Sequence, residues 1–289
     1  MSRAIPQSLA TKLTNGAAAS ILLWIPRTLL SWLIVYPLIM AIQSSGMVSG
    51  PDGESVLFRP GSLLLLELLR VAAPALGSAL KVGLVLGVLA VIAELLPLAC
   101  ALDLLWVAGG TLGARIRRAI AIFPRFLWLG GVSLLAQAAL LLGASLLGGA
   151  LKSALEKHDE RLLNVAPLAV LGLALLACTC LGAVLDIGRA ALIQEDLTAR
   201  EALMRALACL RGRPSAVLFG LYASIAASAS AHLGAAWFMT RLDLSTPANG
   251  AIAWAGVAHQ VAVLFALGWR VRWLDRALEL SAEASALSQ

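Results

Sequence analysis

The chain has 289 residues, of which 60% are hydrophobic and only 13% are charged. Soluble domains average about 25% charged residues, so this composition excludes an ordinary soluble protein. The net charge of +6 does not indicate nucleic-acid binding, because the basic residues are spread over several connectors instead of forming one stripe.

The first feature in chain order is an apolar stretch that meets a proline next to an arginine, an arrangement that recurs twice. Residues 1–20 read as an amphipathic helix lying on the bilayer, just before the first of these sites. The recurrence predicts three hairpin repeats, each preceded by an interfacial helix. The prolines and their repeats are Pro26 in 1–108, Pro124 in 109–188 and Pro214 in 189–276.

Six apolar runs reach the roughly 20 residues needed to cross a bilayer. We therefore expect an all-α fold, a polytopic membrane helix bundle. Residues 61–80 are interrupted by charges and a proline, and predict an interfacial or re-entrant segment. Residues 277–289 are polar, and we expect them to fray. The expected spans are about 27–43, 82–108, 125–150, 165–188, 215–239 and 250–270.

The distribution of basic residues predicts the orientation. Of the 22 Lys and Arg residues, 15 fall in the two terminal regions and the connectors 109–125 and 189–214. The positive-inside rule then places both termini in the cytoplasm. The connector 109–125 carries no acid, so we expect it to bind anionic lipid headgroups. Its basic residues are Arg115, Arg117, Arg118 and Arg125.

Polar side chains recur near the middle of three expected spans. Glu94 lies in the second, Gln137 in the third, and His259 and Gln260 in the sixth. An ionisable group at that depth costs at least ~2.5 kcal/mol, so it should face a partner or water. Two interpretations are open. In the first, the four residues form a binding site in which Glu94 carries a proton or cation. In the second, they are hydrogen-bonded contacts between helices.

Two further features lie near the inner ends of spans. Asp186 and Arg189 are three residues apart, which predicts an ion pair, and Asp103 is expected at similar depth. Alternatively, these residues gate a cytoplasmic opening. In the connector 196–213, Thr198 followed by Glu201 predicts a capping box that begins an amphipathic helix. We expect the apolar side of that helix to lie on the bilayer.

The segments Asp186–Glu195, Arg200–Leu203 and Arg211–Arg213 carry a family resemblance. They resemble a region of uncharacterised six-span bacterial membrane proteins, which are related to the membrane domain of some glycerophosphodiester phosphodiesterases. The likeness covers about 30 residues. It implies a fold type and little else. We expect a protein of a bacterial inner membrane. The likeness implies no catalytic residue, because that family's phosphodiesterase chemistry belongs to a separate soluble domain.

Enzymatic readings rest on weaker signals. Ser145 and His232 resemble the serine and histidine segments of rhomboid intramembrane proteases, as nucleophile and base. No nucleotide-binding loop or HExxH motif occurs in the sequence. Cys178 and Cys180 read as small packing residues, so we expect no metal and no cofactor.

Three functions therefore remain open. The first is a non-enzymatic membrane protein that binds or moves a small molecule or lipid. The second is a structural or accessory subunit that docks a cytoplasmic protein partner on its basic connectors. Separately, Glu201-Ala202-Leu203 resembles part of the coupling helix of ABC importer permeases. The third is an intramembrane hydrolase.

Overall fold

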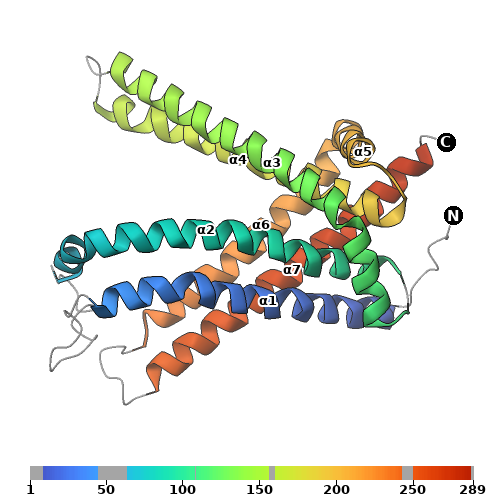
Figure 1. Ribbon diagram of the computed structural model, residues 1–289. Helices are drawn as coiled ribbons and strands as arrows, with labels where there is room; N and C mark the ends of the chain where they lie inside the picture. Colours follow the sequence, from blue (N-terminus) through green and yellow to red (C-terminus); the bar gives the residue numbers. More distant parts are fainter. Residues whose placement is uncertain (1–8, 45–63, 108, 156–159, 243–249, 288–289) are drawn as a thin grey trace. The chain divides into compact units, whose positions relative to one another are not determined.

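The computed structural model describes residues 9–44, 64–107, 109–155, 160–242 and 250–287, and all regular structure in these ranges is helical (Figure 1). The all-α prediction is confirmed for this part of the chain. Its helices are α1 (Leu9–Ser44), α2 (Leu64–Trp106), α3 (Leu112–Leu155), α4 (Glu160–Gln194), α5 (Ala199–Gly212), α6 (Pro214–Met239) and α7 (Ala251–Leu287).

Within the described residues, five helices contain stretches long and apolar enough to cross a membrane. The expected sixth span falls inside α7, and its assignment stays a prediction. The five stretches are Thr11–Pro37, Lys81–Trp106, Leu112–Leu155, Val165–Gln194 and Pro214–Met239.

Large apolar side chains on these helices face outward. Leu84, Leu135, Phe219 and Leu233 are each more than 70% exposed. In water such a surface would drive aggregation, whereas a hydrocarbon layer solvates it. Helices also satisfy their backbone polar groups internally, which is required inside a bilayer. The structure is therefore that of a helical membrane protein.

Two expected interfacial segments are parts of longer helices. The described part of 1–20 continues without a break into the first apolar run, as α1. Residues 64–80 likewise form the start of the 43-residue helix α2 and are not a separate segment. Apolar composition is continuous through both junctions, so the backbone hydrogen bonds of the helix continue as well.

The three proline sites differ from one another. Pro26 lies inside α1 and Pro124 lies inside α3, whereas Pro214 begins α6 directly after α5. A break between interfacial helix and span therefore exists only at the third site. α3 bends along its length (Figure 1), and Pro124, which lacks the amide N–H of a regular helix, is a sufficient cause.

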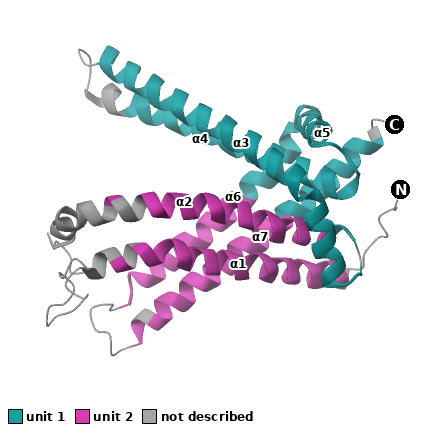
Figure 2. Cartoon of the chain, viewed as in Figure 1, with its two compact units in different colours: residues 1–4, 106–223, 273–289 teal, residues 5–105, 224–272 magenta. Residues whose placement is uncertain are grey.

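The chain divides into two compact units (Figure 2). Unit 1 contains Trp106–Ala223 and Trp273–Gln289 with Met1–Ala4, and unit 2 contains Ile5–Leu105 and Ser224–Arg272. The first part of α6 and the last part of α7 thus belong to unit 1, and the remainder of both helices to unit 2.

In unit 1, α3 and α4 pack side by side along their length, and α5 packs on α4 (Figure 1). The predicted capping box of α5 is confirmed: the Thr198 side chain accepts from the Glu201 amide, and the Glu201 carboxylate accepts from the Thr198 amide. The apolar side of α5 does not lie free for the bilayer as expected. Ala202 and Ala206 are fully buried, and Gly188 of α4 lies against the Ala202 backbone.

The core of unit 2 joins α1, α2 and α7. Ala19, Ala101 and Val271 are buried together, and leucines of α1 and α2 pack around them. Ser224 and Ser228 donate to the backbone carbonyls of Trp269 and Ala266, which ties α6 to α7. Small residues and serine hydroxyls are the usual means of close helix packing in a bilayer.

The expectation of a frayed tail is wrong for residues 277–287. α7 continues to Leu287, and Leu278 and Leu280 are buried. Polar composition predicts fraying only where the charges face solvent. Here Glu283 pairs with Arg213, directly after α5, and Glu279 pairs with Arg276.

Candidate functional site

A groove of about 280 Å³ lies between α1 and α7 in unit 2. Its wall combines one cation, several hydrogen-bonding groups and three apolar side chains. Most of these side chains are exposed, so the groove opens at the surface of the unit. The lining residues are Arg27, Thr28, Ser31, Trp32, Val35, His259, Gln260 and Val263.

Arg27 supplies the positive charge of the groove. Arg27 lies within Thr11–Pro37, the part of the continuous helix α1 that is long and apolar enough to cross a membrane, and not at its first residue as the sequence suggested. An arginine inside a membrane span needs an anionic partner. Its Nε lies 3.5 Å from Oε1 of Glu94 on α2. Glu94 therefore adjoins the groove through Arg27, a partner that the sequence reasoning missed.

His259 and Gln260, the two polar residues of the expected sixth span, both line the groove. His259 lies beside His232 of α6, with ring centroids 6.2 Å apart. Gln260 accepts a hydrogen bond of 3.0 Å from the Trp24 indole N–H. That bond holds the Gln260 amide against α1, so a contact between side chains of α1 and α7 stabilises the wall of the groove.

Gln137 does not belong to this group of residues. It lies in unit 1, where its amide nitrogen is 3.4 Å from the Ser133 hydroxyl and 3.5 Å from the Cys178 carbonyl oxygen. These contacts join α3 to α4, so Gln137 makes the kind of hydrogen-bonded contact between helices that was the second interpretation of the midplane residues. Three of the four predicted midplane residues, Glu94, His259 and Gln260, are thus associated with one groove, and the fourth is a packing contact elsewhere.

The predicted pair of Asp186 and Arg189 is present and buried in unit 1. Arg189 Nη1 lies 3.8 Å from Asp186 Oδ1, and the residues are 7% and 2% exposed. The Trp273 indole N–H donates to Asp186 Oδ2 at 2.8 Å. Arg189 also lies over the Phe126 ring, 5.8 Å from its centroid. Asp103, expected at similar depth, is buried in unit 2.

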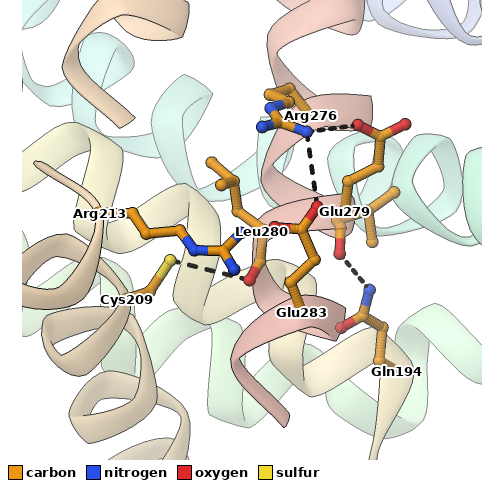
Figure 3. A network of polar contacts seen from close by, with 8 residues as sticks. Gln194, Cys209, Arg213, Arg276, Glu279, Leu280 and Glu283 are labelled. Atoms are coloured by element: carbon orange, nitrogen blue, oxygen red, sulfur yellow. Dashed lines mark hydrogen bonds and ion pairs between the residues drawn. The ribbon is translucent and has the colours of Figure 1, made fainter. Parts of the chain in front are cut away.

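A polar network joins α4, α5 and the end of α7 (Figure 3). Arg213 pairs with Glu283, while Arg276 pairs with Glu279 at 2.9 Å. Gln194 donates to the Leu278 carbonyl at 2.7 Å, and the Cys209 thiol lies 3.8 Å from the Leu280 carbonyl. This network explains why the polar end of the chain is ordered.

Two groups in the same region have shifted pKa values. The hydrogen bond from Arg205 lowers the pKa of Glu195, against the opposing effect of burial. Burial raises the pKa of the Cys209 thiol. A buried, protonated thiol is a poor nucleophile, so Cys209 reads as a packing residue and not as a reactive one.

The basic segment 109–125, whose four arginines lie in the first part of α3, is less available to lipid than expected. Arg115 is buried, and it donates to the carbonyls of Val107 and Gly109. Arg125 pairs with Asp196 and donates to the Leu197 carbonyl. Only Arg117 and Arg118 of the four are exposed. Arg115 and Arg125 therefore stabilise the neighbouring loops of the chain. The sequence could not show this, because their partners include backbone carbonyls.

The enzymatic candidates are not assembled within either unit. Ser145 belongs to unit 1 and His232 to unit 2, where His232 lies beside His259. Among the described residues, no group of three His, Cys, Asp or Glu side chains could hold a metal ion.

No family model, no curated protein and no solved structure matches this chain. The resemblance to the membrane domain of glycerophosphodiester phosphodiesterases accordingly stays an expectation.

The buried carboxylate of Asp186 predicts the cost of losing Trp273. Trp273→Phe keeps a six-membered aromatic ring but removes the rest of the buried indole with its N–H donor, so the free energy of unfolding should fall by at least roughly 2 kcal/mol, the value of a hydrogen bond to a charged group. Thermal unfolding of the purified protein in mild detergent measures the change. Trp254→Phe is the control, because Trp254 is 62% exposed. Equal midpoints for the two variants would contradict the role of Trp273.

Proposed function

We propose that this chain is a non-enzymatic integral membrane protein that binds an amphiphilic ligand, a lipid or a lipid-like small molecule, in the groove of unit 2. The observation that carries the proposal is the composition of the groove. Arg27, His259 and Gln260 offer polar contacts for a headgroup, while Trp32, Val35 and Val263 offer apolar surface for a chain.

The position of the groove supports entry from the bilayer. It lies on the apolar stretch of α1, where Leu29 and Leu33 are 66% and 52% exposed. A ligand that reaches Arg27 must therefore pass apolar side chains that face the hydrocarbon layer. A lipid satisfies both requirements, because it brings its own apolar chain and a polar group that can bind a guanidinium.

The proposal predicts that bound lipid depends on Arg27. Extraction of the purified protein and quantification of the lipids by mass spectrometry should show about tenfold less tightly bound lipid in Arg27→Gln, since a charge-assisted hydrogen bond of at least ~1.4 kcal/mol is lost. Trp32→Ala should reduce it as well, without touching the ion pair. The control is Arg241→Gln, because Arg241 stacks on Trp237 outside the groove.

Unchanged lipid in both groove variants would contradict lipid binding at this site. The accessory-subunit function would then be the better account. The exposed face of α5 favours it, since Met204 is 57% exposed and both Arg200 and Arg211 are exposed as well.

We further propose a topology of six spans in three hairpin repeats, with both termini in the cytoplasm of a bacterial inner membrane. The bias of Lys and Arg toward the termini and two connectors, which hold 15 of the 22, supports this orientation.

The orientation predicts opposite labelling at the two ends of α3. In a background without the four native cysteines, Asp159→Cys should react with an impermeant thiol reagent added to intact cells. Arg117→Cys, near the start of α3, should react only after the cells are opened. Labelling of Arg117→Cys from outside would reverse the proposed orientation.

A further inference from the structure

Arg27 takes part in two arrangements at once. It lines the groove, and it also pairs with Glu94 through Nε. The separation of 3.5 Å is longer than the 2.7–2.9 Å typical of a charge-assisted hydrogen bond. The side chains are 51% and 38% exposed, so neither is locked in the interior. The pair is loose enough for its arginine to be taken by another anion.

The guanidinium has donors to spare for such an anion. Arginine carries five N–H groups in a fixed fork, and the described contact with Glu94 uses the Nε side of that fork. The two Nη groups together can bind a phosphate or carboxylate in a bidentate manner. An anionic headgroup in the groove can therefore reach Arg27 while Glu94 is still nearby.

The charge of the groove selects the class of ligand. None of the eight lining residues is acidic, and Thr28, Ser31, His259 and Gln260 can all donate hydrogen bonds. A phosphate or carboxylate headgroup matches this set of donors, whereas a cationic headgroup would meet Arg27 with like charge. A zwitterionic headgroup would bring one charge of each sign.

We propose that the groove binds an anionic amphiphile and that Glu94 is its intramolecular competitor for Arg27. This inference rests on the proposed lipid binding. In the empty groove Glu94 neutralises Arg27, which an arginine within a membrane span requires. An incoming anionic headgroup takes over that role, and its departure returns Arg27 to Glu94. The carboxylate thus weakens binding of the ligand and keeps the empty site neutral.

Native mass spectrometry in a neutral detergent tests the competition. Phosphatidylglycerol is the anionic probe and phosphatidylcholine the matched zwitterionic one. Glu94→Gln removes the competing charge and keeps the shape, so it should bind phosphatidylglycerol about tenfold more tightly, a factor typical of one removed charge interaction. Its affinity for phosphatidylcholine should change little. Glu94→Leu replaces Glu94→Gln if that variant does not fold.

A double-variant cycle assigns the effect to the pair. Arg27→Gln should lose preference for the anionic probe, and adding Glu94→Gln to it should restore nothing, because the contested guanidinium is gone. An unchanged or weaker affinity in Glu94→Gln would overturn the competition while loss in Arg27→Gln still supports lipid binding. Wild-type binding in both Arg27→Gln and Trp32→Ala would instead overturn the proposed function.

A third arm tests whether the ligand is an amphiphile. Inorganic phosphate carries the same headgroup chemistry without an apolar chain, so it should not displace phosphatidylglycerol from the wild-type protein. Displacement of phosphatidylglycerol by millimolar phosphate would overturn the proposal that the ligand is an amphiphile, and would identify the ligand as a soluble anion.

Discussion

The buried carboxylate of Asp186 is the constraint on which the packing of unit 1 depends. A carboxylate that is 2% exposed must find donors or its charge is expensive to bury. Arg189, on the next turn of the same helix, supplies a countercharge 3.8 Å away, and the Trp273 indole N–H of α7 donates a hydrogen bond. To reach Asp186, the Trp273 ring packs so closely on α6 that a Cβ on Gly220 would lie 3.0 Å from it. One hydrogen bond thereby sets the contacts of three helices.

In unit 2 the corresponding polar pair is exposed and loose. Arg27 and Glu94 are about half exposed, and Arg27 lines a groove instead of a packed core. A buried pair with added donors rigidifies a structure, whereas a loose pair at a groove can exchange partners. The two pairs therefore suit different roles. The Asp186 pair holds helices together, and the Arg27 pair is where a ligand can act.

Local spacing predicted the features whose partners are neighbours in sequence. The capping box of Thr198 and Glu201 and the pair of Asp186 and Arg189 both follow from positions three residues apart on one helix. Partners far apart in sequence were missed, because hydropathy marks which residues are helical but not which helices touch. Trp273 for Asp186 and Arg27 for Glu94 are of this kind. The sequence also overstated how strongly proline and charge end a helix. Pro26 does not end α1, and the charged end of α7 is helical and packed.

The central claim is that an amphiphile occupies the groove between α1 and α7. Photo-crosslinking in membranes with a diazirine-bearing phosphatidylglycerol, followed by peptide mapping, tests it most directly. The account predicts that labelled residues concentrate at 28–35 and 259–263. Label spread evenly over the exposed leucines of all the helices, with no enrichment at these two segments, would contradict it.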